Sequence, residues 1–337
     1  MKILFSGYHN PHFLTITEYA ERALSSLGHH VIVFDDRQHI IPGRIRRRMK
    51  WLHEFDLRHV NNQFVSLALN TKPGIAVVTG GHRILGDSVT SLRENGVFTA
   101  LWTIDAPVNF EPILKTAALY DCVFCGGTEA QKILYDNGIS DTHWLPFACS
   151  PDFHHHIALT DQEKKAYAKD VVFVGSFYSN RWEILRELSE FDIGIWGPHW
   201  NKAECETLGR LSIKDVQLTY SEWLKIFSAT KIVIVIHYQD GKTPCYQASP
   251  KVYEALACKS FVLVDRQKDV FSLFNDGEHL VAFDNTEDLK QKVMYYLDHA
   301  DERKRIATRG YREVLNKHTY SHRMGEMFAM VENGCHS

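Results

Sequence analysis

Residues 249–265 read SPKVYEALACKSFVLVD, and this stretch predicts the fold around it. Ser249 is a favourable N-cap and Pro250 a favourable first helical residue, so a helix is expected to begin here and to run to about Cys258. The apolar run SFVLVD that follows predicts a buried strand. A helix leading directly into a nearly continuous apolar strand is typical of a parallel sheet that is covered on both faces.

Lys251 is unusual at this position, because a cation in the first turn of a helix opposes the helix dipole. A bound anion would resolve the conflict, since the backbone N–H groups, the dipole and the ammonium group would all attract it. Glu254 lies one turn further along on the same face, where it could accept hydrogen bonds from a ribose beside a phosphate. The ordinary alternative is that Lys251 only pairs with Glu254 at the i,i+3 spacing.

A second cation occupies a similar position in residues 175–185, which read GSFYSNRWEIL. Asn180 is predicted to be an N-cap, with Glu183 completing a capping box, so Arg181 would be the first helical residue. This turn follows the apolar run VVFVG and therefore lies at the carboxyl edge of the sheet, where open α/β sheets bind ligands. Lys251 and Arg181 together predict a site for a diphosphate. The alternative is that Arg181 is simply solvated.

Apolar runs alternate with helix-like stretches along both halves of the chain. This pattern predicts an α/β fold of two tandem, Rossmann-like, doubly wound parallel-sheet domains. The seam is expected around residues 150–169, where the sequence turns polar and rich in lysine. We therefore assign residues 1–155 to an N-terminal domain, 165–310 to a C-terminal domain, and 311–337 to a C-terminal helical segment.

Two motifs, one of cysteines and one of histidines, are interpreted as structural and not as metal-binding. Cys122 and Cys125 match C-x-x-C, but no second pair accompanies them and their apolar surroundings indicate a buried strand. The run His154–His156 falls in the predicted linker and is interpreted as solvated, because three successive loop histidines do not easily converge on one metal. No metal site is predicted in this chain.

The composition of the chain and the motifs that it lacks disfavour several classes of function. The chain has 337 residues and a net charge of -3, which gives no global attraction to nucleic acid or to anionic membranes. Its first residues read as a strand and not as a signal peptide. Seven scattered cysteines suggest reduced thiols, so a cytoplasmic location is expected. G-x-G-x-x-G, the P-loop motif and D-x-D do not occur, which disfavours dehydrogenases, P-loop phosphoryl transfer and a metal-bridged diphosphate site.

Several motifs together resemble one known group of enzymes. The C-terminal block SPKVYEALACKSFVLVDRQKDVFSLFNDGEHLVAFDNTEDLKQKV and the later stretch DERKRIATRGYREVLNKHTYSHRM are similar to the C-terminal domain of GT-B glycosyltransferases, most of all the CgeB-like group. The likeness extends through DVVFVGSFYSNRWEIL, IWGPHW and YSEWLKIFSATKIVIVIH to the N-terminal LWTIDAP and LPFACSPDF. It implies two domains facing a cleft, with a C-terminal helix returning toward the first domain.

The resemblance also implies roles for individual residues of the second domain. Lys251 would meet the diphosphate of a nucleotide-sugar donor, most plausibly a UDP-sugar, and Glu254 would meet its ribose. Arg181 and the Gly175–Ser176 turn would approach the phosphates. No other cofactor is expected. A metal is not expected either, because the charge on the departing diphosphate would be met by these cations and by helix N-termini.

By the same likeness, Gly197 with its loop and Tyr220 would border the nucleotide base. The chain departs from the wider family at two positions. Tyr246 stands where retaining GT-B families carry a second glutamate, so the choice between a retaining and an inverting mechanism stays open. Lys259 replaces a glycine that is common after Ala-Cys, which is expected to alter only a turn.

In GT-B enzymes the loops after the N-terminal strands face the acceptor. Here those loops offer Asp105, His9, His12 and His82. Asp105, which follows an apolar strand, is our first candidate for the general base, and His9 is the second. His82 is assigned to the acceptor side. The structural alternatives are that Asp105 is a turn or N-cap residue and that His82 is an ordinary loop histidine.

Residues 43–50, GRIRRRMK, form the strongest charge cluster. Such runs are usually solvated. The functional alternative assigns Arg46, Arg47 and Arg48 to an acidic acceptor, such as a phosphorylated polymer or DNA, through contacts with phosphates.

The sequence thus predicts a metal-independent glycosyltransferase that moves a sugar from a nucleotide diphosphate to a hydroxyl group on a glycan, a protein, a small molecule or DNA. A glycosyltransferase acting on modified DNA bases, a nucleotide-sugar epimerase of GT-B form and a bilobed sugar-binding protein are the alternatives.

Overall fold

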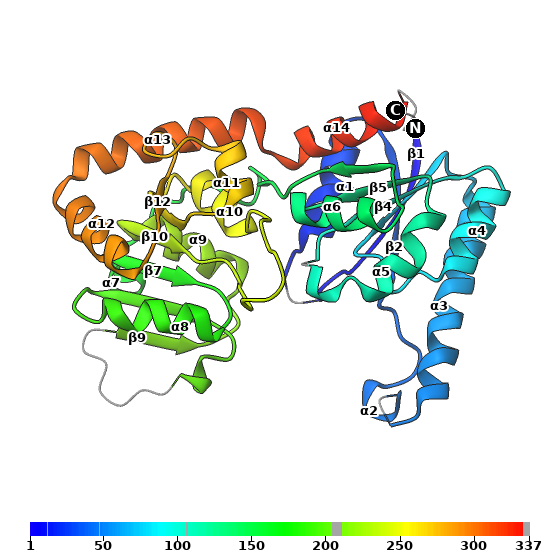
Figure 1. The fold of residues 1–337 in the computed structure, drawn as a ribbon, viewed down its shortest axis with the longest axis horizontal. Helices are drawn as coiled ribbons and strands as arrows, with labels where there is room; N and C mark the ends of the chain where they lie inside the picture. Colours follow the sequence, from blue (N-terminus) through cyan, green and yellow to red (C-terminus); the bar gives the residue numbers. More distant parts are fainter. Residues whose placement is uncertain (12, 47, 106, 204–210, 333–337) are drawn as a thin grey trace. The chain divides into compact units, whose positions relative to one another are not determined.

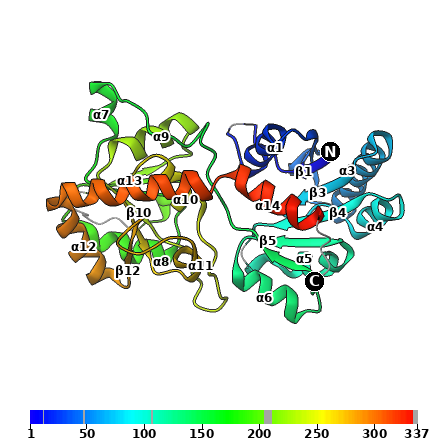
Figure 2. The ribbon, with the colours of Figure 1, turned by 90° about the horizontal axis from the view of Figure 1, so that it is seen from above.

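The computed structural model describes residues 1–11, 13–46, 48–105, 107–203 and 211–332. The chain divides into two compact units (Figures 1 and 2). Unit 1 consists of Met1–Pro146 together with Tyr320–Ser337, and unit 2 consists of Phe147–Thr319.

Unit 1 is built on a six-stranded parallel sheet with the strand order β2-β1-β3-β4-β5-β6. Its strands are β1 (Lys2–Gly7), β2 (His30–Asp35), β3 (Ile75–Thr79), β4 (Phe98–Thr103), β5 (Cys122–Cys125) and β6 (Thr142–Trp144). All five residues of β3 and all four of β5 are buried, as expected for a sheet with helices on both faces.

The helices of unit 1 cover both faces of this sheet. They are α1 (Ile16–Ser26), α2 (Gly43–Arg46), α3 (Lys50–Thr71), α4 (Gly86–Glu94), α5 (Glu111–Thr116), α6 (Thr128–Asp136) and α14 (Tyr320–Glu332), with 3-10 turns η1 (Pro107–Asn109) and η2 (Ala117–Leu119). Helices α1 and α14 lie side by side, and the rings of Tyr19 and Tyr320 lie 5.6 Å apart between them (Figure 2). Phe64, Leu92 and Leu134, from α3, α4 and α6, share one buried core cluster.

Unit 2 repeats the architecture with the parallel order β12-β11-β10-β7-β8-β9. Its strands are β7 (Val171–Val174), β8 (Ile193–Gly197), β9 (Leu211–Asp215), β10 (Ile232–Val235), β11 (Val262–Asp265) and β12 (Val281–Phe283). Its helices are α7 (Asp161–Tyr167), α8 (Ser179–Leu185), α9 (Tyr220–Ala229), α10 (Pro250–Ala257), α11 (Lys268–Leu273), α12 (Thr286–Asp298) and α13 (Ala300–Lys317), with η3 (Arg186–Leu188) and η4 (Trp200–Lys202). The predicted fold class of two doubly wound parallel sheets is confirmed.

The stretch from residue 249 to residue 265 folds as its sequence predicts. The hydroxyl of Ser249 accepts a hydrogen bond from the Lys251 N–H at 3.3 Å, so Ser249 is the N-cap of α10 and Pro250 opens the helix. The helix ends at Ala257, one residue earlier than predicted, and Lys259 has a left-handed φ of 60°. The missing glycine therefore leaves the turn in place, because lysine adopts the conformation that glycine favours at the end of a helix.

The division between the units lies at Pro146 and Phe147, earlier in the chain than the expected seam. The segment after it is held within unit 2, since the Cys149 N–H donates to the His318 carbonyl at 3.0 Å. The expected third segment starts at residue 311, in the middle of α13 (Ala300–Lys317), and the chain returns to unit 1 only at Tyr320.

The histidine run is not uniformly solvated, which corrects the sequence interpretation. His154 is 4% exposed and accepts a hydrogen bond from the Ser150 N–H at 3.0 Å, whereas His155 and His156 are exposed. Burial lowers the pKa of His154 to about 4. None of the described helices is both long and apolar enough to cross a bilayer.

Candidate functional site

A pocket of about 270 Å³ lies at the carboxyl ends of β7 and β10 in unit 2. Four of the predicted donor-binding residues meet there, namely Gly175, Ser176, Arg181 and Lys251. Its remaining lining residues are Phe173, Val174, Tyr178, Val235, Ile236, Tyr238, Ser249 and Pro250. The two cations that the sequence singled out therefore share one pocket.

Arg181 is fixed in this pocket by backbone carbonyl groups. Its Nε donates to the Ile236 carbonyl at 2.9 Å, and its Nη1 donates to the Ser176 carbonyl at 3.0 Å. The guanidinium carbon also lies 4.8 Å from the centre of the Tyr178 ring. Among the described residues no carboxylate forms an ion pair with Arg181, so its positive charge is available to a bound anion.

The cap of α8 differs from the prediction. Tyr178 is the N-cap, with no capping hydrogen bond from its side chain. Asn180 lies inside the helix, and its Nδ2 donates to the His237 carbonyl at 2.9 Å. Because the helix starts at Ser179, Asn180 is not the N-cap, so the predicted capping box with Glu183 does not form and Arg181 is the third helical residue instead of the first.

Lys251 both pairs with Glu254 and reaches the pocket. Its Nζ lies 2.8 Å from Oε2 of Glu254, so the i,i+3 pair forms, and it also lies 3.4 Å from the centre of the Trp223 ring. Its side chain is 21% exposed and reaches the pocket. Burial lowers the pKa of Lys251, and Glu254 opposes that shift. Glu254 is 7% exposed and is not among the residues that line the pocket.

His237 and Asp265 connect the elements of this site, and the sequence reasoning missed both. Nδ1 of His237 lies 2.6 Å from Oδ1 of Asp265, and Nε2 accepts a hydrogen bond from the Ser249 N–H at 2.9 Å. Because Nε2 is an acceptor, the ring proton lies on Nδ1 and is donated to Asp265. His237 thus holds Ser249, the N-cap of α10, while its own carbonyl holds Asn180 on α8.

The two glycines of the site allow a close approach between backbone segments. Gly197 has a φ of 151°, and a Cβ placed on it would lie 2.0 Å from the Gly175 carbonyl oxygen. That same oxygen accepts a hydrogen bond from Trp200 Nε1 at 2.8 Å. Gly197 therefore supports the Gly175 turn from behind and is not itself among the residues lining the pocket.

Tyr220 lies elsewhere in unit 2. Its hydroxyl donates to the Phe153 carbonyl, and the two rings meet edge to face at 5.6 Å. Burial raises the pKa of Tyr220 to about 12. Tyr220 is the first residue of α9 and does not line the pocket, so the structure does not bring it together with Arg181 and Lys251.

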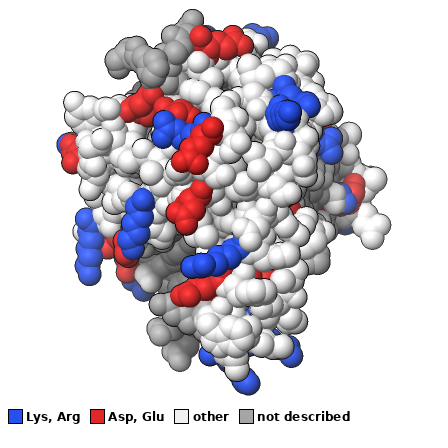
Figure 3. Space-filling model, turned by 90° about the vertical axis from the view of Figure 1, so that its right-hand side faces the viewer, with Lys and Arg blue, Asp and Glu red and all other residues white. Residues whose placement is uncertain are grey.

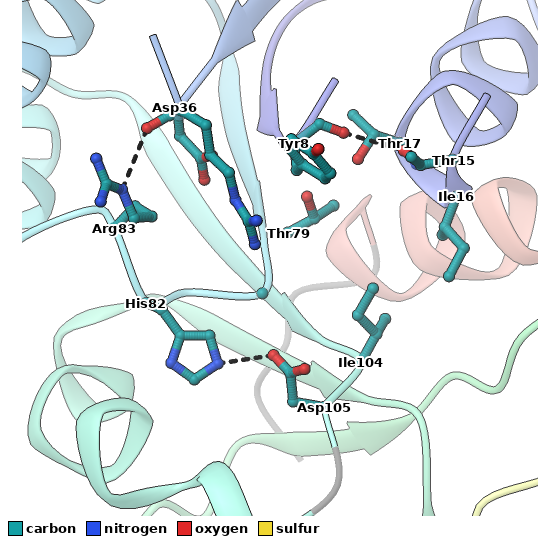
Figure 4. Close-up of a pocket in the computed structure, with 12 residues that line it drawn as sticks. Tyr8, Thr15, Ile16, Thr17, Asp36, Thr79, His82, Arg83, Ile104 and Asp105 are labelled. Atoms are coloured by element: carbon teal, nitrogen blue, oxygen red, sulfur yellow. Dashed lines mark hydrogen bonds and ion pairs between the residues drawn. The ribbon is translucent and has the colours of Figure 1, made fainter. Parts of the chain in front are cut away.

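Unit 1 contains a second pocket, of about 160 Å³, at the carboxyl edge of its own sheet (Figure 4). It is lined by Tyr8, Thr15, Ile16, Thr17, Asp36, Arg37, Thr79, Gly80, His82, Arg83, Ile104 and Asp105. Two predicted residues meet here, since Nε2 of His82 lies 2.7 Å from Oδ2 of Asp105 (Figure 4). The hydrogen bond with Asp105 raises the pKa of His82.

His9, the second candidate for the general base, is engaged with a helix. Its Nε2 lies 2.8 Å from Oε1 of Glu21 on α1, and it does not line the pocket of unit 1. Burial raises the pKa of Glu21. The structure therefore brings Asp105 together with His82 and leaves His9 beside Glu21. His12 lies outside the residues that the structure describes.

Asp36 is a pocket residue that the sequence reasoning missed. It is 4% exposed, and burial raises its pKa to about 6. Its Oδ1 is buried and has no hydrogen-bond partner among the described residues. Arg83 reaches the same residue, donating from Nε to the Asp36 carbonyl at 3.3 Å. The doublet Asp35–Asp36 at the end of an apolar run was the available signal, because that position predicts the carboxyl edge of the sheet.

The basic run of residues 43–50 is partly structural. Arg46 Nη1 lies 2.8 Å from Oδ2 of Asp56, which is fully buried. Burial opposes ionisation of Asp56, but hydrogen bonds from Arg46, from the Ile40 and Ile41 N–H groups and from His39 lower its pKa to about 2. Arg46 therefore serves the fold and is not free for the predicted acceptor contact.

Arg48 is exposed, and Arg47 lies outside the described residues. On the face drawn in Figure 3, basic and acidic side chains are interspersed and form no large area of one sign.

One group of side chains could hold a metal ion. Ligand atoms of Cys122, Asp141 and His143 lie within 4.8 Å of one another at the β5–β6 edge of unit 1. His143 Nε2 already lies 2.8 Å from Asp141 Oδ1. Cys122 and Cys125 are both buried, as the sequence predicted, and neither lines the two pockets described above.

Comparisons with known proteins agree with this architecture. Residues 181–329 match a family model described as glycosyl transferase-like. Spore protein CgeB of Bacillus subtilis (strain 168) is 19% identical over 262 residues, which cover 74% of this chain and 80% of that protein. The sucrose-phosphate synthase of Thermosynechococcus elongatus superposes with a TM-score of 0.71 at 12% identity and 98% coverage of each chain.

A second solved structure is Anabaena Alr3699/HepE in complex with UDP and glucose. It superposes with a TM-score of 0.65 at 12% identity, covering 99% of this chain and 100% of that chain. The resemblance predicted from the motifs around Lys251 is confirmed by these matches. The chain therefore has the fold of these GT-B proteins, and its residues 181–329 match a glycosyl transferase-like family model.

Proposed function

We propose that the pocket of unit 2 binds the diphosphate of a UDP-type nucleotide sugar. The observation that carries the proposal is Arg181, a cation without a carboxylate partner among the described residues, in one pocket with Lys251. The N-terminus of α10 adds the backbone N–H groups and the dipole that favour an anion. The complex of Alr3699/HepE with UDP and glucose, a protein of the same fold, supports the choice of nucleotide.

Both cations stabilise the negative charge that develops on the departing diphosphate, so transfer proceeds without a metal in this proposal. Lys251 Nζ donates a hydrogen bond to Oε2 of Glu254, which orients the ammonium group. Its other oxygen accepts a hydrogen bond from a ribose hydroxyl. In this proposal Gly175 and Ser176, which line the pocket, approach the phosphates.

The pocket of unit 1 receives the acceptor in this proposal. The acceptor hydroxyl oxygen forms the new bond to the anomeric carbon of the sugar, while the bond from that carbon to the diphosphate breaks. The hydroxyl proton passes to a carboxylate of the pocket. Asp105, oriented by His82, and Asp36, whose burial raises its pKa to about 6, are the two residues that offer one.

The first experiment measures binding of a panel of nucleotide sugars by calorimetry, with and without EDTA. Arg181→Gln removes the cation, and we expect it to weaken binding of the preferred donor roughly 10- to 100-fold. Arg181→Lys keeps the charge but lacks the planar fork of donors that bonds both carbonyls, so an intermediate loss is expected. Arg186→Gln is the matched control, because Arg186 is 51% exposed and lies outside the pocket.

The second experiment follows release of free UDP from the preferred donor with candidate acceptors. Release with glycosylation of a hydroxyl acceptor, unaffected by EDTA, supports the proposal. Failure of every nucleotide to bind contradicts it, and conversion of the donor to an isomer without UDP release identifies an epimerase. Transfer to modified duplex DNA would identify that acceptor class, although the Arg46–Asp56 ion pair gives no support to it.

A further inference from the structure

A cluster of large apolar side chains is exposed around α2 and the start of α3. The exposed fractions are 55% for Ile40, 50% for Ile45, 46% for Met49, 65% for Trp51 and 56% for Phe55. We call these five residues the α2–α3 patch. Single exposed apolar residues are ordinary in proteins, but a group of large ones within a short segment marks an interaction surface.

The patch is held in place by a buried carboxylate. Oδ2 of Asp56 bonds Arg46 of α2 at 2.8 Å, and Oδ1 accepts from the Ile40 N–H at 3.0 Å. These bonds fix the segment before α3 against the α3 helix itself. Trp51 and Phe55 are four residues apart in α3 and therefore share one face of it. In Figure 1 this end of α3 extends with α2 beyond the edge of the sheet.

The charge around the patch has one predominant sign. Residues 40–58 contain six Lys and Arg residues and two acidic ones; the buried Asp56 neutralises Arg46, and Glu54 is exposed. Arg44, Arg48 and Arg58 are exposed. Exposed aromatic and aliphatic side chains interleaved with cations fit the interface of an anionic bilayer, where rings enter the headgroup region and cations meet phosphates. Duplex DNA would use the cations but would leave Trp51 and Phe55 without a role.

We propose that the α2–α3 patch docks this protein on the surface of an anionic lipid bilayer. Trp51 and Phe55 insert at the level of the headgroups, and Arg44 and Arg48 bind lipid phosphates. Residues of the patch line neither of the two pockets. The inference therefore goes beyond the proposed function and does not depend on the identity of the donor.

The test is flotation of the full chain with two kinds of vesicle. One kind is phosphatidylcholine alone, and the other is phosphatidylcholine in which about one lipid in three is phosphatidylglycerol. We expect binding only to the anionic vesicles, weakened by added salt, together with a blue shift of tryptophan emission. The double variant Trp51→Ser/Phe55→Ser and the double variant Arg44→Gln/Arg48→Gln should each bind roughly tenfold more weakly or worse. The first variant should also lose the blue shift.

Tyr135→Ser/Met294→Ser is the matched control, because these side chains are 64% and 52% exposed but lie outside the patch. It should bind vesicles like the unaltered protein. Thermal unfolding of all variants separates loss of docking from loss of folding. The proposal is overturned if neither vesicle is bound, if the control loses as much binding as the patch variants, if duplex DNA is bound in place of vesicles, or if the patch variants instead convert a dimer to a monomer.

Discussion

The pockets of the two units lie at the same edge of two similar sheets, yet they carry opposite chemistry. In unit 2 the lining residues include two cations, Arg181 and Lys251, and no carboxylate among those described. In unit 1 the lining residues include two carboxylates, Asp36 and Asp105, beside arginines and a histidine. A single fold thus supplies one edge suited to an anion and another suited to accepting a proton.

The two pockets also differ in how their ionisable groups are satisfied. Arg181 is held by backbone carbonyls and Lys251 by the carboxylate of Glu254. In unit 1 the His82–Asp105 pair is about one-third exposed, and Asp36 keeps a buried oxygen without a partner among the described residues. The unit 2 pocket is therefore preorganised by the fold, whereas the unit 1 pocket retains unsatisfied groups that a ligand can use.

The largest effect is expected from Gly197→Ala, which tests whether the unit 2 pocket depends on its backbone. The added Cβ would lie 2.0 Å from the Gly175 carbonyl oxygen, so the turn must shift. We expect a loss of about 3 kcal/mol of stability or more, and loss of donor binding. Gly241→Ala is the control, because Gly241 also has a positive φ but no atom near its Cβ position. Equal behaviour of the two variants in thermal unfolding would argue against a rigid pocket.

Asp36→Asn tests the unsatisfied carboxylate of unit 1. Because the folded pKa of about 6 exceeds the ordinary value of 3.8, the charged form is penalised in the folded protein and stability falls as pH rises from about 4 to 6. The variant should be more stable than the unaltered protein above pH 6, by about 3 kcal/mol at most, and equal to it near pH 3. Chemical unfolding at pH 3, 5 and 8 measures this.

The same variant should lose activity if the carboxylate serves the acceptor pocket. A gain in stability together with a loss of transfer, with donor affinity unchanged, would support an acceptor role for the unit 1 pocket that is separate from donor binding in unit 2. If stability did not change with pH in either protein, the assigned burial of Asp36 would be wrong.

Variants of His237 test whether this side chain positions the N-terminus of α10 or only packs within unit 2. Its Nε2 accepts from the Ser249 N–H and its Nδ1 donates to Asp265. In His237→Gln the amide oxygen can still accept at the Nε2 position, whereas His237→Asn can replace only the group at Nδ1. We expect the asparagine variant to raise the KM for the donor roughly tenfold and the glutamine variant to raise it less. Equal losses in both variants, accompanied by equal drops in melting temperature, would indicate packing alone.

The smallest effect is expected from the exposed pair of unit 1. The hydrogen bond to Asp105 raises the pKa of His82 above its ordinary value of 6.5, so this stabilisation is present below pH 6.5 and is lost as pH rises through the folded pKa. Asp105→Asn should cost less than about 1 kcal/mol at pH 5.5 and nothing at pH 9, because both side chains are about one-third exposed. A cost that persists at pH 9 would point to a structural role for Asp105 in its turn.

The elements of the fold and four of the twelve residues that line the unit 2 pocket could be predicted because their signals are local. Ser249, Pro250 and Lys251 are adjacent in sequence, and a helix start after an apolar run fixes which edge of the sheet they occupy. Asp105 was predicted by the same reasoning. It is paired in the structure with His82, which comes from the neighbouring strand edge.

The interactions that escaped prediction join residues far apart in the chain. Asn180 is a favourable cap by its local sequence, but its side chain bonds the His237 carbonyl, 57 residues away. Arg46 was expected to be solvated or, in the functional alternative, to contact an acidic acceptor, but its partner is Asp56, ten residues further along in the next helix. Single-sequence patterns give the edge on which a side chain lies but not which partner reaches it there.

The discontinuous composition of unit 1 has a consequence for how the protein is made. Its sheet is complete by residue 146, yet α14, whose Tyr320 lies against Trp102 and Tyr19, is translated only after all of unit 2. During synthesis, the part of this sheet that α14 covers stays exposed until Tyr320–Glu332 has left the exit tunnel. Unit 1 is thus begun before unit 2 and completed after it.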